Sequence, residues 1–212
     1  MLARSIAKSG RKRSTNGTVT TAFSGDLPAH QKRKGLVLVL IAFSLQALIA
    51  TAILVHMVPM LGALGLSGSA AFICAIFGPP QVASRLINML GGKNLAPISL
   101  AVISASLMGL ALIVLLFGAP SIIATMMFAC LFGFGNGLFS IVSGTLPLSL
   151  FGSDGYGAMQ GKIMSARLII SATAPFAMAF GIENIGVNWS LFILTLTVGW
   201  ATLTLIGLKL LR

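Results

Sequence analysis

Four polar side chains lie near the middle of stretches that are otherwise apolar, and they define the chemistry open to this chain. They are Gln46, Gln81, Asn136 and Arg167. An arginine at the centre of a membrane helix costs about 2.5 to 3.5 kcal/mol on insertion scales, so it usually faces a partner or a watery cavity. Because these stretches contain no Asp or Glu, Arg167 either binds an anion from outside the chain or reaches the membrane interface and backbone carbonyls.

The amides also have two interpretations. Gln46 and Asn136 suit hydrogen bonds between helices, and they equally suit contact with a bound solute. We treat Arg167, Gln46, Asn136 and Gln81 together as candidates for substrate binding.

The sequence gives little support to enzyme chemistry. A metal site needs clustered His, Cys or carboxylate ligands, yet the histidines are His30, before the first apolar stretch, and His56, near its end. A serine nucleophile needs a partner base, and Ser143 in "IVSGT" has no histidine to use in the last stretch, so it better suits helix packing. We expect no enzymatic activity, no metal and no cofactor.

These residues must be held by membrane helices, because the chain is 57% hydrophobic and only 8% charged. A bilayer core about 30 Å thick needs roughly 20 apolar residues in a helix. We predict an all-α membrane protein with six spans. They cover about Leu36 to Val58, Ser69 to Leu90, Leu95 to Phe117, Ser121 to Leu146, Tyr156 to Gly181 and Asn188 to Leu210.

The basic residues predict the orientation of these spans, because Lys and Arg are retained on the cytoplasmic side. Eight of the fourteen precede the first span, and Lys93, Lys162, Lys209 and Arg212 agree with them. The three connections placed outside contain no Lys or Arg. We therefore expect both termini in the cytoplasm and the protein in the cell inner or plasma membrane.

Residues 1–34 are expected to form a basic, disordered cytoplasmic segment ahead of a six-helix domain over residues 35–212, because they are rich in Ser, Thr, Gly, Lys and Arg. The net charge of +11 reflects this segment, so we do not expect nucleic acid as a partner. The same composition fits a mitochondrial transit peptide or attraction to anionic lipid headgroups.

Small residues and prolines mark where helices approach or bend. Gly133 and Gly137 in the fourth span, and Gly157 and Gly161 in the fifth, recur at four-residue spacing, which allows close helix packing. Pro79, Pro80 and Pro175 lie inside predicted helices, where each removes a backbone hydrogen bond. We predict packing at the glycines and bending at the prolines.

The stretch "SRLINMLGGK" resembles the loop motif at the cytoplasmic end of the eighth helix in the major facilitator superfamily of transporters, Gly-Arg-Leu-x-Asp-Arg-x-Gly-Arg-Arg. Four residues fit that frame: Arg85, Leu86, Gly91 and Lys93. Asn88 stands where the family has an acid that can help to lock one gate state, which implies a weaker latch here. The resemblance assigns Arg85, Asn88, Gly91 and Lys93 to a gate motif.

A second stretch, "LFGSDGYGAMQGKIMSARLIISATAPFAMAFGIENIG", resembles the family's loop between helices ten and eleven and the helix that follows. The likeness covers about Lys32 to Arg212 and corresponds to the C-terminal six-helix half of such a transporter. It implies two inverted three-helix repeats, and a central path lined by the helices that carry Gln46, Gln81, Asn136 and Arg167.

The expected function is therefore half of a transporter that moves a small solute by alternating access, with Arg167 favouring an anionic one. The family has twelve spans and this chain has six, so it would pair with a second six-helix half, form a homodimer, or be a truncated product without activity of its own. The competing hypothesis is a non-transporting membrane protein that interacts or regulates through its helix faces.

Overall fold

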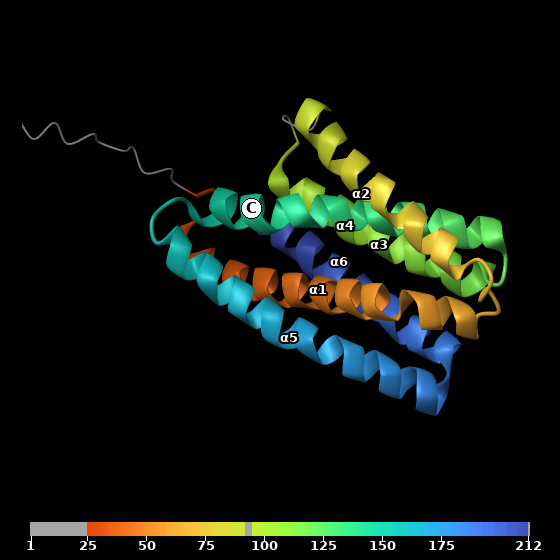
Figure 1. The fold of residues 1–212 in the computed structure, drawn as a ribbon. Helices are drawn as coiled ribbons and strands as arrows, with labels where there is room; N and C mark the ends of the chain where they lie inside the picture. Colours follow the sequence, from red (N-terminus) through yellow and green to blue (C-terminus); the bar gives the residue numbers. More distant parts are fainter. Residues whose placement is uncertain (1–24, 92–94, 212) are drawn as a thin grey trace, which may run out of the picture.

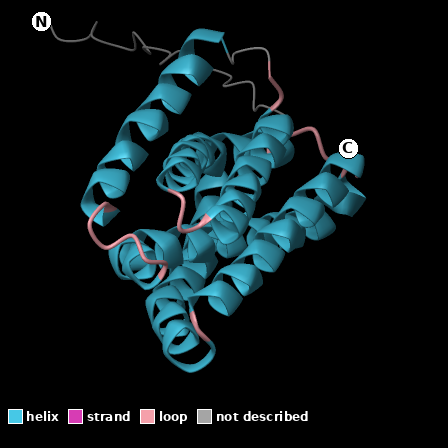
Figure 2. Cartoon of the chain, turned by 90° about the vertical axis from the view of Figure 1, so that its right-hand side faces the viewer, coloured by secondary structure: helices cyan, strands magenta, loops and turns pink. Residues whose placement is uncertain are grey.

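Six long α-helices, joined by short loops, form the part of the chain that the computed structural model describes, residues 25–91 and 95–211 (Figures 1 and 2). They are α1 (Lys32–Ala63), α2 (Ala70–Gly91), α3 (Pro97–Gly118), α4 (Ile122–Phe151), α5 (Tyr156–Ile185) and α6 (Val187–Leu210). All six are long and apolar enough to cross a membrane. The predicted all-helical fold with six helices of membrane-spanning length is confirmed.

Several helices extend beyond their predicted ends. α1 continues past Val58 to Ala63 and α4 past Leu146 to Phe151, although each contains a proline, Pro59 or Pro147, near its C-terminal end. A proline removes a single backbone donor. The remaining backbone hydrogen bonds continue the helix beyond the residue at which the apolar stretch ends.

The connection between α5 and α6 is shorter than the predicted loop after Gly181. α5 continues through Glu183 to Ile185, and only Gly186 separates it from α6. Gly186 has a φ of 86°, a left-handed conformation that glycine adopts without strain. The chain therefore reverses at one residue.

The residues just before α1 are attached to the end of α4. The backbone N–H groups of Asp26 and Leu27 donate to the carbonyls of Ser149 and Leu150, at 3.0 and 3.1 Å. Leu27 is buried, and a short 3-10 turn, Ala29–Gln31, leads into α1 at Lys32. Residues 1–24 of the predicted basic segment lie outside the described residues.

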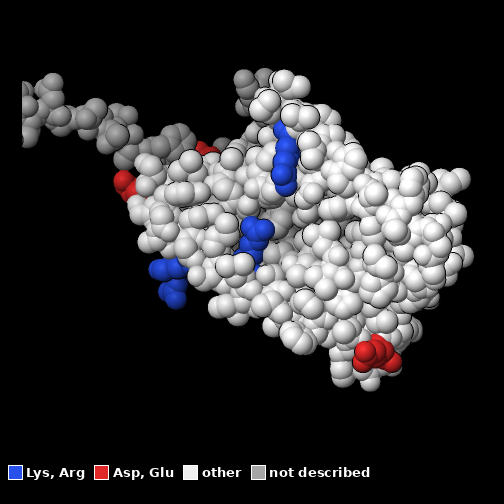
Figure 3. Space-filling view, in the orientation of Figure 1, with Lys and Arg blue, Asp and Glu red and all other residues white. Residues whose placement is uncertain are grey.

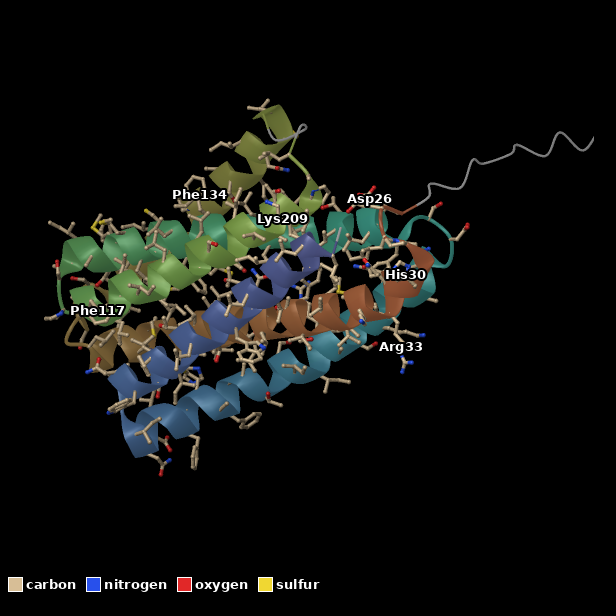
Figure 4. All side chains as sticks on the ribbon, turned by 180° about the vertical axis from the view of Figure 1, so that it is seen from behind. Asp26, His30, Arg33, Phe117, Phe134 and Lys209 are labelled. Carbon is tan, nitrogen blue, oxygen red and sulfur yellow. The ribbon has the colours of Figure 1, made fainter. Side chains whose placement is uncertain are left out.

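The helices form two layers. α1 and α4 lie between α2 and α5 in the layer nearest the viewer of Figure 1, and α3 and α6 lie behind them, as the reverse view shows (Figure 4). Asp26, His30 and Arg33 lie at one end of the bundle and Phe117 at the other (Figure 4).

The packing of the helices is paired. α2 packs on α4 and α5 on α1, while α3 packs on α4 and α6 on α1, and α3 and α6 also meet each other. α2 and α5 are the least covered helices: the buried residues of α2 are Ala70, Ile73, Phe77 and Ser84, and those of α5 are Ile163, Ala174 and Met178. One broad face of the bundle, bounded by α2 and α5, is therefore uncovered.

Candidate functional site

A cavity of about 540 Å³ opens on the uncovered face between α1, α2, α4 and α5. Its polar lining residues are Thr51, Gln81, Asn136, Ser140, Arg167 and Ser171. Each of the four helices supplies at least one of them, so the cavity collects the polar groups of the spans into one place. This volume falls within the range of about 300 to 1,000 Å³ that is typical of sites for small molecules.

Arg167 is the charged residue of this cavity, and an aromatic ring holds it. Its Cζ atom lies 4.6 Å from the centroid of the Phe139 ring, and its Nη1 donates a weak bond to the Met164 sulfur at 4.0 Å. The Phe139 ring in turn meets Phe43 of α1 edge to face, with centroids 5.6 Å apart. These contacts link α5, α4 and α1 across the bundle.

No carboxylate lines the cavity, so the positive charge of Arg167 is not neutralised by a lining residue. A ring face attracts a cation by about 0.5 to 2 kcal/mol, less than a desolvated cation requires. Figure 3 shows one group of Lys and Arg atoms at the middle of this face and others toward its top and left edges, while the Asp and Glu atoms lie near its edges. The site is electropositive.

Gln81 and Asn136 come from two helices that approach closely, as predicted from the glycines of α4. A methyl group added at Gly133 would meet the Phe77 carbonyl oxygen, and one at Gly137 would meet that of Gln81. The absence of side chains at these two positions lets α2 lie against α4. The predicted packing role of Gly133 and Gly137 is thus consistent with the structure.

Gly135, which we did not predict, does the same for α3. A side chain there would meet Met108 Cγ and the Ser104 carbonyl oxygen. The three alternate glycines of "FGFGNG" thus face two different helices.

Gln46 does not reach the cavity, contrary to its prediction as a substrate-binding residue. It is fully buried, and its Nε2 donates to Ser104 Oγ at 3.3 Å and to the Met108 sulfur at 3.7 Å. Both acceptors lie on α3, behind the face that carries Arg167. Its role is the hydrogen bonding between helices that was the alternative.

The small residues of α5 also differ from their prediction. Methyl groups added at Gly157 or Gly161 would meet nothing within 4 Å, and both residues are exposed. α5 packs on α1 through other residues, such as Ile163 and Ala174, which leaves the two glycines on its open side. Within this chain they are not packing residues.

The prolines fall inside helices as predicted. Pro79 and Pro80 lie within α2, and Pro175 lies within α5. Gln81 follows the proline pair directly, and Pro175 lies two turns beyond Arg167.

The gate motif lies at the end of α2, away from the main cavity. Arg85 is exposed, and Gly91 is the last residue of the helix. Asn88 lines a separate groove of about 320 Å³ with residues of α3 and α4, and its Oδ1 is buried without a hydrogen-bond partner among the described residues. Lys93 lies outside the described residues.

The cavity also contains polar residues that we did not predict. Ser140 follows Asn136 by four residues and Ser171 follows Arg167 by four, so each lies one helical turn further on the same face. This spacing is a signal that the sequence does contain. Thr51 of α1 has no predicted residue four positions away, because Gln46 lies five residues before it and faces α3.

Two side chains near the start of α5 form hydrogen bonds to α4. Tyr156 Oη donates to the Gly144 carbonyl at 2.9 Å, and Gln160 Nε2 donates to the Ser143 carbonyl at 3.0 Å. Both bonds join the start of α5 to α4. They are the direct side-chain hydrogen bonds between these two helices in the described part of the chain.

The chemistry of the site is binding chemistry. It offers one guanidinium, two amides and three hydroxyls, all of which suit an anion or a hydroxylated molecule. The described residues contain no group of three or more His, Cys, Asp or Glu that could hold a metal ion. Comparisons of the sequence with models of known protein families and with curated proteins find no match.

Proposed function

We propose that this chain is half of a secondary transporter that moves a small anionic solute across a membrane by alternating access. The observation that carries the proposal is Arg167, which lines a cavity that has polar groups from four helices and no carboxylate. We propose transport and not catalysis, because these groups bind and orient a solute but do not include a nucleophile paired with a base.

The energetics favour an anion as the solute. A guanidinium removed from water without a counter-ion is costly, and an incoming carboxylate or phosphate replaces lost hydration with charge-assisted hydrogen bonds. Each such bond contributes about 1.5 to 3 kcal/mol. Gln81 and Asn136 can donate or accept further bonds to the uncharged part of the solute.

The resemblance to the major facilitator superfamily agrees with the way the helices pack. Exchanging α1 with α4, α2 with α5 and α3 with α6 converts each main packing pair into another, including α2 on α4 into α5 on α1. Such an exchange is expected of two three-helix repeats. A repeat with an odd number of spans must be inverted relative to its copy, as in transporters that rock about a central site.

The uncovered face supports the need for a second half. In a transporter of this kind the solute lies between two six-helix units, and the cavity of this chain opens on the face that such a unit would cover. Either a second polypeptide or a second copy can supply that unit. We propose that the termini lie in the cytoplasm and the protein in the cell inner or plasma membrane, as the basic residues predict.

A second function is favoured by one specific observation. Gly157 and Gly161 form a small-residue face on the open side of α5, and such faces allow close approach of a helix from another protein. A membrane protein that binds and regulates a partner through α5 would use this face without moving a solute.

Uptake by vesicles that contain the purified chain tests the proposal. A panel of labelled carboxylates and organic phosphates should include at least one that enters with saturable kinetics, and Arg167→Ala should reduce this uptake about 10- to 100-fold, the value of one charge-assisted bond. Lys162→Ala is the matched control, because Lys162 is an exposed cation of the same helix that does not line the cavity. Uptake that Arg167→Ala leaves unchanged would reject the assignment of the site, and lack of any saturable uptake would favour the regulatory function.

A further inference from the structure

Two serines of the cavity already use their only donor hydrogen within their own helices. Ser140 Oγ donates to the Gly137 carbonyl at 2.6 Å, and Ser171 Oγ donates to the Leu168 carbonyl at 3.2 Å. The direction of these bonds is fixed, because a carbonyl oxygen can only accept. A hydroxyl group has one donor hydrogen and two acceptor lone pairs, so both serines present acceptors to the cavity that they line.

Arg167 has the opposite character, because a guanidinium donates hydrogen bonds and cannot accept them. Thr51, Gln81 and Asn136, the other polar residues of the lining, can do either. A solute that satisfies this lining must therefore bring an anionic acceptor for Arg167 and donor groups for the two serines.

The register of α4 and α5 places these groups at two levels of the bundle. The two helices run in opposite directions on either side of a short loop. Ser140 lies eleven residues before the end of α4 and Arg167 eleven residues after the start of α5, and the contact of Arg167 with Phe139 agrees with this register. Asn136 and Ser171 each lie fifteen residues from the same ends, about 6 Å further along the helices. One serine acceptor is thus level with Arg167 and the other lies about one turn beyond it.

We propose that the solute is a polyhydroxylated monocarboxylate of the sugar-acid class. Its carboxylate binds Arg167, the hydroxyl next to the carboxylate donates to Ser140, and a hydroxyl further along its carbon chain donates to Ser171. The inference rests on the proposed transport function and specifies its solute. A second half would line the other side of the solute and would leave the requirements of these three residues in place.

Charge and hydrogen bonding favour this class over related anions. A phosphate monoester carries a charge of about −1.5 to −2 at pH 7, more than a single guanidinium neutralises, whereas a carboxylate carries one. A carboxylate without hydroxyls would bring no donors to the two serine oxygens, and a polar group left unpaired in a closed site is costly. An ammonium group could donate to the serines, but it would meet no carboxylate among the lining residues. Uncharged hydroxyls avoid both costs.

Uptake of labelled gluconate by vesicles that contain the full chain tests this inference. Uptake should be saturable, and Ser140→Ala and Ser171→Ala should each raise its KM about 2- to 13-fold, the value of one net hydrogen bond. Alanine is the best helix former, so neither change should disturb its helix. Ser165→Ala is the matched control and should leave KM unchanged, because Ser165 also donates to a carbonyl of α5, at 2.9 Å, but does not line the cavity.

Two unlabelled analogues, used as inhibitors of gluconate uptake, separate recognition from structure. The analogue 2-deoxygluconate lacks the hydroxyl next to the carboxylate, so Ser140→Ala should not weaken its inhibition. Lactate has that hydroxyl but none further along its chain, so Ser171→Ala should not weaken inhibition by lactate. An equal loss for gluconate and the analogue would mean that the substitution acts through structure, and it would overturn the inference. A KM for gluconate that neither serine affects would overturn it as well.

The outcomes also separate this inference from the function on which it rests. Saturable uptake of another carboxylate or of an organic phosphate that depends on Arg167, without uptake of gluconate, would reject the sugar acid and keep the transporter. Uptake of gluconate that depends on Arg167 and on both serines supports both proposals. Lack of saturable uptake of any anion by well-folded protein would reject both.

Discussion

The substitution Gly137→Ala tests whether the backbones of α2 and α4 lie in direct contact at Gly137. The added methyl group would overlap the Gln81 carbonyl oxygen and Ser84 Oγ, and it would lie 3.2 Å from the Gln81 carbonyl carbon. The Ser84 side chain can rotate away, but the Gln81 carbonyl belongs to the backbone of α2. The whole helix must therefore shift.

The expected cost follows from this overlap. Overpacking a well-packed contact typically costs about 1 to 3 kcal/mol. A free energy of 1.36 kcal/mol corresponds to a factor of about 10 in an equilibrium constant, so the unfolding equilibrium should rise about 5- to 150-fold. Because Gln81 lines the cavity, the same shift should also weaken anion uptake.

Gly144→Ala is the matched control on the same helix. A methyl group there meets nothing within 4 Å, so alanine should be neutral or should stabilise the helix by up to about 1 kcal/mol. Both variants are compared by reversible unfolding of the purified protein in mixed detergent micelles of increasing SDS content. Equal stability of the two variants would refute the close contact between α2 and α4.

Three other substitutions test separate features. Gln46→Leu should change the free energy of unfolding by about 0.6 kcal/mol and by no more than about 1.7 kcal/mol, the average and the maximum for polar contacts between membrane helices. It should leave uptake unchanged, because Gln46 faces α3 and not the cavity. Lost uptake without lost stability would contradict this placement. Tyr156→Phe combined with Gln160→Ala removes both hydrogen bonds from the start of α5 to α4. The double variant should raise the rate at which a water-soluble maleimide, added from the proposed cytoplasmic side, labels a cysteine introduced at Ser140. An unchanged labelling rate would mean that the two bonds do not restrict access to the cavity. Asn88→Asp introduces the acid that the resembled family has at this position. If the chain alternates between inward and outward states as proposed, the change should alter the labelling of the same cysteine. Labelling equal to that of the chain with Asn88 would leave the motif as a signal of topology alone.

The six helices could be predicted from sequence because their signal is the composition of long segments. Runs of about 20 apolar residues need internal hydrogen bonding in a bilayer, whatever they pack against. Their ends were less predictable. α1 and α4 continue through Pro59 and Pro147, where the local hydrogen bonds and not the hydropathy decide the end.

The site could be predicted only in part, because depth along a helix is encoded in the sequence and direction around the helix is not. Gln46 and Gln81 both lie near mid-depth in apolar segments. Gln81 faces the cavity and Gln46 faces α3. The few polar residues within α1 do not gather on one side of the helix, so no polar stripe indicates which side meets α3.

The glycines show the same limit. Those of α4 and α5 have similar spacing, yet Gly133 and Gly137 meet the backbone of α2 whereas Gly157 and Gly161 meet nothing. Spacing along one helix shows that close approach is possible. The partner helix has to be present for the approach to occur, and α5 contributes a different face to its contact with α1.

The single residue between α5 and α6 makes α5 a lever with its fulcrum at Gly186. The two helices cannot separate at that end, so a swing of α5 grows in amplitude with distance from the fulcrum. Arg167 lies nineteen residues before Gly186, or about 28 Å along the helix, and a swing of about 10° would carry it about 5 Å. Tyr156 and Gln160 lie at the end of α5 farthest from Gly186. Their hydrogen bonds to α4 therefore limit a swing of α5 most effectively, and with it the distance between Arg167 and the Phe139 ring.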